Sequence, residues 1–178
     1  MRELSTLPAV SLRATFGSNV DLAALSGRTV LYLYPRTGRP GTETPEGWDM
    51  IPGARGCTPE ACSFRDDFAA LRAAGVTRVF GVSSQDSDYQ SEVVERLRLP
   101  FAMLSDPALA LADALELPTF VAGGETFYQR LTIIANGSTI EKVFFPGPDP
   151  PNRAAEHVAR LVAGKQLPTT PPTRLEYT

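Results

Sequence analysis

GCTPEACSFRD, residues 56–66, contains both cysteines of the chain and decides the fold. It starts a helix, because the Thr58 hydroxyl can cap free amides and a proline in the first turn loses no hydrogen bond. Apolar residues then recur on one helical face as far as residue 74, where Gly75 follows. The stretch therefore predicts a helix over residues 58–74, with Cys57 at its amino end.

The position of Cys57 favours a reactive sulfur. Free amides and the helix macrodipole at an amino end stabilise a thiolate. If this setting and a nearby arginine lower the thiol pKa from about 8.5 to about 6, the thiolate fraction at pH 7 rises only about thirtyfold. A fast reaction therefore also needs hydrogen-bond donors that stabilise charge on the substrate in the transition state.

Cys62 follows Cys57 by five positions, which is about one and a half helical turns. In an intact helix their Cα atoms would lie roughly 8 to 9 Å apart, whereas a disulfide requires less than about 7 Å. A disulfide between them therefore requires the first turns of the helix to unwind. The alternative interpretation is that Cys62 is a small buried helix residue without redox function.

Strand-like and helix-like segments alternate on either side of this stretch, which indicates an α/β domain. The predicted strands cover residues 28–34, 76–83, 100–104, 130–135 and 139–145, the last two joined by Asn136-Gly137-Ser138. The further predicted helices cover residues 88–97, 107–115 and 152–163. This order is the thioredoxin-like plan, with a central mixed sheet flanked by helices. We expect one domain over residues 1–165, an irregular loop over 35–56, and an extended tail over 166–178.

Composition excludes several classes of function. With 17 basic and 20 acidic residues, the formal charge of −3 favours neither nucleic acid nor an anionic membrane surface as partner. No apolar run approaches the roughly 20 residues of a membrane span. Residues 1–11 lack the pattern of a secretory signal, so we expect a cytoplasmic location, where two cysteines are not a permanent structural disulfide. Two thiolates are too few for a closed zinc site, and we expect neither metal nor cofactor.

Beyond these derivations, GCTPEACSFRD resembles the peroxidatic-cysteine segment of the bacterioferritin-comigratory-protein (PrxQ) branch of the peroxiredoxins. The resemblance extends to Tyr34-Pro35, to VSSQD at 82–86, to LPF at 99–101 with LSD at 104–106, and to RLT at 130–132. It implies that Cys57 is oxidised by the peroxide to a sulfenic acid and that Cys62 resolves it as a disulfide. It also implies that Arg130 holds the thiolate and polarises the peroxide, and that Pro35 shields the pocket.

The resemblance implies a thiol peroxidase for hydrogen peroxide and organic hydroperoxides, recycled by thioredoxin or a similar dithiol. We expect a monomer. The family places a Thr or Ser three residues before the peroxidatic cysteine, where this chain has Ala54, and residues 36–56 expand the usual short connection. We select Thr44, with Thr37 and Thr42 as alternatives, to supply the missing hydroxyl, and Gly56 to support the pocket. Trp48 either covers the active site or only anchors the loop.

Two other functions remain open from sequence. A thioredoxin-like thiol-disulfide oxidoreductase would use the same fold, with Pro118-Thr119 as its cis-proline loop, but such enzymes carry Cys-x-x-Cys. A redox-sensing binding protein would use helix unwinding to expose a partner surface.

Overall fold

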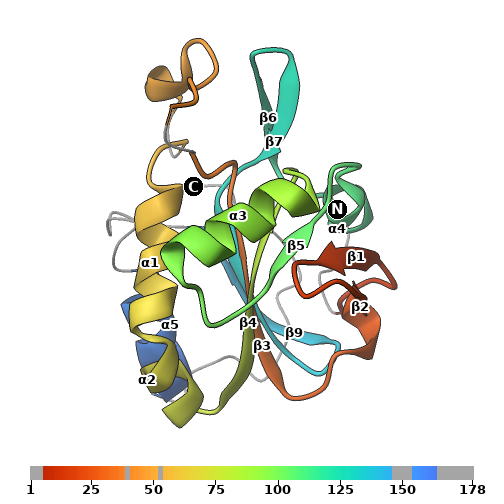
Figure 1. Ribbon diagram of the computed structural model, residues 1–178. Helices are drawn as coiled ribbons and strands as arrows, with labels where there is room; N and C mark the ends of the chain where they lie inside the picture. Colours follow the sequence, from red (N-terminus) through yellow and green to blue (C-terminus); the bar gives the residue numbers. More distant parts are fainter. Residues whose placement is uncertain (1–5, 39–40, 52–53, 146–153, 164–178) are drawn as a thin grey trace.

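The computed structural model describes residues 6–38, 41–51, 54–145 and 154–163 (Figure 1). A mixed seven-stranded sheet has the order β2-β1-β5-β4-β3-β8-β9, and β6 and β7 form a separate two-stranded ribbon. The strands are β1 (Ser11–Ala14), β2 (Asn19–Asp21), β3 (Arg28–Leu33), β4 (Val76–Ser83), β5 (Met103–Ser105), β6 (Thr119–Ala122), β7 (Glu125–Tyr128), β8 (Leu131–Asn136) and β9 (Thr139–Phe144). The helices are η1 (Leu22–Ala24), η2 (Trp48–Met50), α1 (Cys57–Asp66), α2 (Phe68–Ala73), α3 (Ser87–Leu97), α4 (Ala110–Leu115) and α5 (Ala154–Ala163). The predicted thioredoxin-like α/β fold is confirmed.

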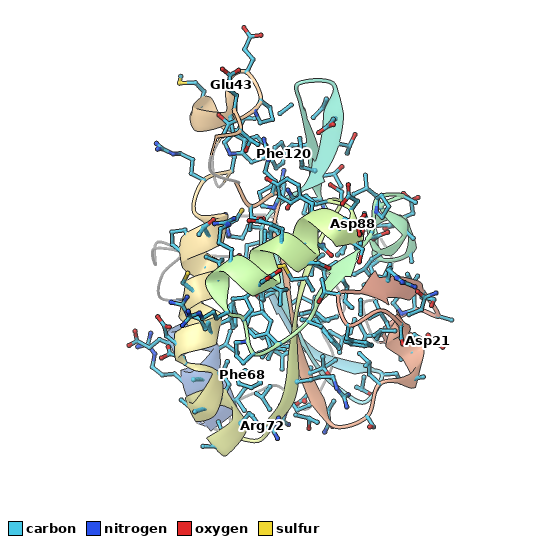
Figure 2. All side chains as sticks on the ribbon, in the orientation of Figure 1. Asp21, Glu43, Phe68, Arg72, Asp88 and Phe120 are labelled. Carbon is cyan, nitrogen blue, oxygen red and sulfur yellow. The ribbon has the colours of Figure 1, made fainter. Side chains whose placement is uncertain are left out.

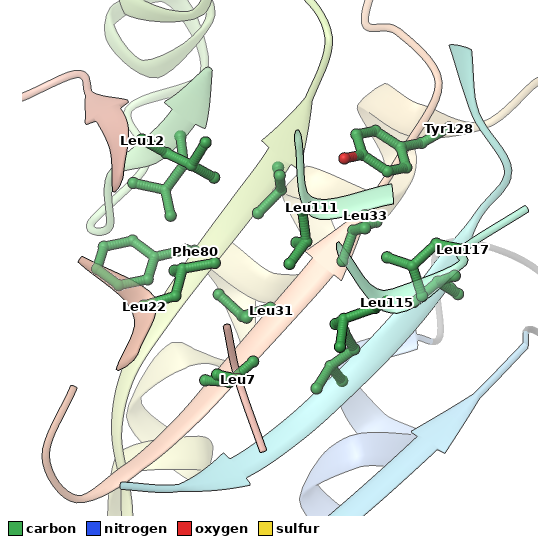
Figure 3. Close-up of a cluster of buried hydrophobic side chains, with 14 of the residues drawn as sticks. Leu7, Leu12, Leu22, Leu31, Leu33, Phe80, Leu111, Leu115, Leu117 and Tyr128 are labelled. Atoms are coloured by element: carbon green, nitrogen blue, oxygen red, sulfur yellow. The ribbon is translucent and has the colours of Figure 1, made fainter. Parts of the chain in front are cut away.

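Strand β3 lies in the interior of the sheet, and its two faces contact two separate layers of the core. It pairs in parallel with β4 and antiparallel with β8, and successive side chains point to opposite faces. Leu31 and Leu33 join the cluster under α4, β1 and η1 (Figure 3). Val30, Tyr32 and Tyr34 join the cluster under α1, α2, α3 and α5, which also contains Cys57. The strand is apolar on both faces because both faces are covered.

Aromatic stacking fixes α1 to this sheet. The rings of Tyr32 and Phe64 are stacked with centroids 4.5 Å apart and an interplanar angle of 8°. Tyr32 also lies against Gly81 of β4, where an added Cβ would meet the Tyr32 hydroxyl at 2.7 Å. Phe64 lies two turns along α1 from Cys57, so this contact holds the helix whose amino end carries the sulfur.

Several sequence-based boundaries need correction. The helix predicted over 58–74 begins at Cys57, with Gly56 as N-cap and no side-chain cap, so Thr58 does not cap it. It is also broken at Asp67, which separates α1 from α2. The apolar periodicity does not reveal this break, because Phe64 and Leu71 remain buried on either side of it. The prediction for residues 166–178 lies outside the described residues.

Two hairpins were absent from the prediction. The pair β1–β2 consists of strands of four and three residues, too short for a clear periodic signal. The pair β6–β7 is joined by Gly123-Gly124, both with positive φ, and a Gly-Gly pair is a recognised hairpin signal. The β6–β7 ribbon extends from one end of the molecule (Figure 1).

The loop that precedes α1 packs against this ribbon. Trp48 is 4% exposed, and its ring centroid lies 5.1 Å from that of Phe127 and 5.6 Å from that of Phe120. Figure 2 shows Glu43 of the loop and Phe120 of the ribbon at the same end of the molecule. Of the two roles considered for Trp48, these contacts support anchoring of the loop.

Prediction for the core: Gly81→Ala should lower the free energy of unfolding by about 1–3 kcal/mol, because the new methyl group overpacks the buried ring of Tyr32. Urea denaturation measures this loss. Gly38→Ala is the matched control, since a Cβ there meets nothing within 4 Å. Equal stability of the two variants would show that the contact between Gly81 and Tyr32 is not tight.

Candidate active site

The sulfur of Cys57 lies at the amino end of α1 and is buried. Gly56 precedes it with φ 97°, a left-handed conformation that glycine adopts without strain. The Cys57 side chain is in the cluster beneath α1, and the residue is 3% exposed. Its thiol also lies 3.8 Å from the carbonyl oxygen of Ala54. The predicted placement at a helix amino end is confirmed by the helix bounds.

Arg130 brings its guanidinium to this sulfur from the junction of β7 and β8. Nη2 donates to the Cys57 Sγ at 3.2 Å and to the Arg55 carbonyl at 2.8 Å, and Nη1 donates to the Glu60 Oε1 at 2.6 Å. The side chains of Arg130 and Glu60 are 3% and 2% exposed. One buried guanidinium therefore connects the sulfur, a carboxylate and the backbone just before α1.

Glu60 is the principal residue that the sequence-based prediction missed. It follows Cys57 by three positions, so both side chains lie on the same face of α1. Burial raises the pKa of its carboxyl to about 7, while Arg130 lowers it. The sequence contained one signal for Glu60, because it is an acidic residue three positions after a cysteine at the start of a predicted helix.

Burial also dominates the titration of Cys57. It raises the pKa of the thiol to about 11, the Arg130 charge lowers it, the Glu60 charge raises it, and the Arg36 backbone amide lowers it. This direction is opposite to the shift toward about 6 that we supposed from the sequence. The expectation counted the helix end and the arginine, but it included neither complete desolvation nor a carboxylate that shares the same guanidinium.

A second buried cluster fixes the segment that leads to Arg130. The Tyr128 hydroxyl donates to Asp106 Oδ2 at 2.5 Å and accepts from the Ala112 amide at 3.0 Å. The other Asp106 oxygen accepts from the Ala110 amide at 2.8 Å, at the start of α4. Because Tyr128 precedes Arg130 by two residues, these bonds position the guanidinium relative to the sheet.

The proposed support residues differ in their placement. Pro35 is buried two residues after the end of β3, and the backbone amide of Arg36, which follows it, lowers the pKa of the Cys57 thiol. Thr44 is exposed, and no hydrogen bond among the described residues joins it to Cys57. Thr37 is buried but bonds to Gln85. The structure therefore does not bring the Thr44 or Thr37 hydroxyl to the position of the missing family hydroxyl.

Both cysteines are reduced, and Cys62 is half-buried on α1. Both cysteines lie on the continuous helix α1, so a disulfide between them requires the first turns of this helix to unwind. At the other end of α1, the Ala155 amide of α5 donates to the Ser63 hydroxyl at 3.1 Å. Ser63 and Phe64 are therefore held in place just after Cys62.

A cavity of about 650 Å³ is bordered by Arg36 but does not include the cysteine site. It is lined by Arg36, Gln85, Tyr89, Thr126 and Phe127, among others, and neither Cys57 nor Arg130 lines it. Among the described residues, no three His, Cys, Asp or Glu side chains gather in a group that could bind a metal. No helix in the described ranges has the length and apolar character needed to cross a membrane.

Comparison with protein families matches residues 3–159 to the Redoxin family model. The chain is 31% identical to the chloroplastic peroxiredoxin Q of Suaeda salsa over 136 residues, which cover 76% of this chain and 56% of the relative. It is 34% identical to peroxiredoxin Bcp of Bacillus subtilis over 114 residues, which cover 62% of this chain and 60% of the relative. The chain thus spans little more than half the length of these curated relatives.

Solved structures share the fold at lower identity. Peroxidoxin BcpB from Mycobacterium tuberculosis superposes with a TM-score of 0.69 at 20% identity, covering 93% of this chain and 98% of that one. The bacterioferritin comigratory protein of Xanthomonas campestris, a protein described for its alkyl peroxide reduction activity, gives a TM-score of 0.70 at 19% identity. That match covers 92% of this chain and 98% of the Xanthomonas protein.

Prediction for the site: Glu60→Gln should lower the pKa of the Cys57 thiol by about one pH unit, because it removes a like charge yet keeps an oxygen for Arg130 to bond. The measurement is the rate of thiol alkylation against pH in a Cys62→Ser background, where Cys57 is the single thiol.

Arg130→Met provides the opposite control and should raise the same pKa, because it removes the nearby positive charge. If the midpoint for Glu60→Gln stayed at or above that of the parent, the carboxylate would not be controlling the sulfur.

Proposed function

The chain belongs to the Redoxin family, and we propose that it is a thiol peroxidase in which Cys57 attacks a peroxide and Cys62 resolves the oxidised sulfur. Curated relatives at 31% and 34% identity are named as peroxiredoxins Q and Bcp. One observation in the structure carries the proposal. The Arg130 guanidinium lies 3.2 Å from the Cys57 sulfur, at the amino end of a helix. Hydrogen-bond donors beside the attacking sulfur support the proposal, because they can stabilise negative charge that develops on a peroxide oxygen.

In the first step, the Cys57 thiolate attacks the terminal oxygen of the hydroperoxide and the O–O bond breaks. The sulfur becomes a sulfenic acid, and the peroxide leaves as an alkoxide or hydroxide that takes up one proton. Counting the proton first lost by the thiol, a thiol and a hydroperoxide give a sulfenic acid and an alcohol or water. Arg130 stabilises the charge on the oxygens during this transfer.

In the second step, the Cys62 thiol condenses with the sulfenic acid. The S–S bond forms, and the sulfenic oxygen leaves as water with the Cys62 proton. A dithiol reductant of the thioredoxin type then returns both cysteines to thiols and is itself oxidised to a disulfide. Metal and cofactor have no part in any of these steps.

Formation of the thiolate depends on Glu60 and on exposure of the sulfur. When Glu60 is protonated, the carboxylate no longer raises the pKa of Cys57, and the Arg130 charge acts on the sulfur alone. Entry of a polar peroxide or opening of the first turn of α1 solvates the sulfur and removes the largest cause of its raised pKa. The burial that keeps the thiol neutral therefore also protects it between turnovers.

Burial argues against direct exchange with protein disulfides. A sulfur on a residue that is 3% exposed admits a small peroxide more readily than a bulky disulfide. The thioredoxin-like alternative also expects a Cys-x-x-Cys pair, whereas four residues separate Cys57 from Cys62. Peroxide consumption compared with insulin-disulfide reduction tests this choice of function.

We propose hydrogen peroxide and organic hydroperoxides as the substrates. We also propose that the protein works as a monomer in the cytoplasm and that residues 1–165 form the catalytic domain. The relatives include chloroplastic proteins as well as a bacterial one. Alkyl hydroperoxides are suitable test substrates, because the Xanthomonas protein was described for reducing them.

Prediction for the cysteines: Cys57→Ser should abolish peroxide consumption, because an unactivated serine hydroxyl stays protonated at neutral pH and is a very weak nucleophile. Cys62→Ser should consume one equivalent of peroxide and then stop unless a small thiol is added. Mass analysis of the two cysteine peptides after one equivalent of hydrogen peroxide identifies the products. Full activity of Cys57→Ser would falsify the assignment.

Prediction for the helix: formation of the disulfide should increase hydrogen exchange at residues 57–62, because their Cα atoms must approach from about 8 to 9 Å to within about 7 Å. Ser63 and Phe64 should keep more of their protection, since α5 and Tyr32 hold them. Unchanged protection at 57–62 in a verified intramolecular disulfide would contradict the unwinding model.

A further inference from the structure

Arg65 joins α1 to the carboxyl end of α3. Its Nη1 donates to the Leu97 carbonyl at 2.9 Å, and Leu97 is the last residue of α3. The last carbonyls of a helix have no donor within the helix, and a cation beside them is favoured. The Arg65 Nε donates to the Asp66 carboxylate at 2.9 Å, which fixes the direction of the guanidinium. One side chain therefore ties the carboxyl half of α1 to α3.

The two preceding residues anchor the same half of α1. The Ser63 hydroxyl accepts from the Ala155 amide at 3.1 Å, and this amide lies in the first turn of α5, where it has no partner within its own helix. The Phe64 ring stacks on Tyr32 of β3 with centroids 4.5 Å apart. Contacts to α5, β3 and α3 thus follow one another along the helix, directly after Cys62.

The amino half of α1 depends on a single partner. Cys57 and Glu60 both bond the Arg130 guanidinium. Between them, Thr58 is only half-buried and Pro59 is exposed. Oxidation of the sulfur changes one of the acceptors that Arg130 holds, whereas it alters none of the contacts of the carboxyl half. The two halves of the helix therefore differ in the contacts that must break before each can move.

The geometry points to Arg65 as a positioning residue for the resolving step, which holds Cys62 in place while Cys57 moves to it. Cys62 lies three positions before Arg65 on the same face of α1, so the bond to Leu97 fixes the turn that carries the resolving thiol. This inference rests on the proposed roles of the two cysteines. As the S–S bond forms and the sulfenic oxygen leaves as water, the amino half of α1 unwinds and residues 62–65 stay in place.

A stationary resolving thiol speeds the closure of the disulfide. With residues 62–65 held, only the segment that carries the sulfenic acid has to find its partner, and the reaction joins oriented groups. Release of the bond to Leu97 frees this turn, and the existing break at Asp67 lets the unwinding spread to the end of α1. Both sulfurs then move, so productive encounters become rarer. The sulfenic acid persists longer, and a second peroxide can oxidise it to the sulfinic acid.

The test compares Arg65→Gln with Arg72→Gln. Arg72 lies on α2 (Figure 2) and also donates to a backbone carbonyl, that of Thr77 at 3.2 Å, which lies outside α1 and α3. After one equivalent of hydrogen peroxide, Arg65→Gln should close the disulfide about tenfold more slowly. With excess peroxide it should form more sulfinic acid at Cys57, measured by mass analysis. In a Cys62→Ser background it should form the sulfenic acid at the parent rate, and Arg72→Gln should change none of these quantities.

A rescue variant and hydrogen exchange separate positioning from stability. Arg65→Lys keeps a charged donor for the Leu97 carbonyl, so it should restore most of the closure rate. In the disulfide form, residues 63–66 should keep their protection in the parent and lose it in Arg65→Gln. Equal closure rates for the parent and Arg65→Gln, or loss of protection at 63–66 in the oxidised parent, would overturn the inference.

Preparation of the disulfide with diamide makes the exchange measurement independent of the peroxidase reaction. Diamide takes up the two thiol hydrogens as the thiols form a disulfide. A parent that consumes no peroxide but keeps its protection at 63–66 would overturn the proposed function and support the positioning role. A parent that consumes peroxide yet exchanges freely at 63–66 would overturn the positioning role alone. Failure of Cys57 and Cys62 to pair under diamide would overturn both.

Discussion

The interaction on which the site depends is the sharing of one buried guanidinium among three acceptors. Arg130 bonds the Cys57 sulfur, the Glu60 carboxylate and the Arg55 carbonyl, and these three acceptors come from the junction of the loop and the first turn of α1. A buried charge is tolerated only when it is paired and hydrogen-bonded. The contacts with Cys57 and Glu60 require an intact first turn of α1. Unwinding of that turn therefore removes both contacts together, and it transfers Glu60 from a buried ion pair to water.

This coupling links the proposed chemistry to protonation. In the folded helix, burial raises the pKa of Glu60 to about 7, and in water the carboxyl returns to its ordinary value of about 4.5. Unwinding near neutral pH therefore favours release of a proton from Glu60. A group with a raised folded pKa contributes stability below its unfolded pKa, and that contribution is lost as pH rises through the folded value. The folded helix is thus favoured toward pH 5 relative to pH 8, which is a physical basis for oxidised chains to unwind more easily at higher pH.

Sequence reasoning identified those features that depend on local patterns. The strand at Val76–Ser83 was predicted with the observed bounds, and the amino end of α1 was placed within one residue. The β6–β7 ribbon, which a Gly-Gly turn joins, was not predicted, and neither was the break at Asp67, where the apolar periodicity continues through a residue with non-helical backbone angles. In the site, Cys57 and Arg130 were selected from the sequence. Glu60 and the Arg36 amide were not selected: the position of Glu60 three residues after Cys57 is a weak local signal, and the contact of Glu60 with Arg130 joins distant segments. The raised pKa of Cys57 follows from tertiary burial, which a local pattern does not report.

The long loop before α1 explains how the site is built without the hydroxyl usual in the family. Ala54 occupies that position, is 1% exposed, and belongs to the apolar cluster formed by Trp48, Ala122 and Phe127. A methyl group there provides packing where a hydroxyl would provide a hydrogen bond, and the Trp48 anchor holds the segment beside the ribbon. The Arg130 guanidinium then donates to the sulfur from the junction of β7 and β8, and the Arg36 backbone amide, at the start of the insertion, lowers the pKa of the thiol. Because these two groups lie 94 positions apart in the chain (130 − 36), no short segment of it can assemble the site, and the reactivity proposed for Cys57 is a property of the folded domain.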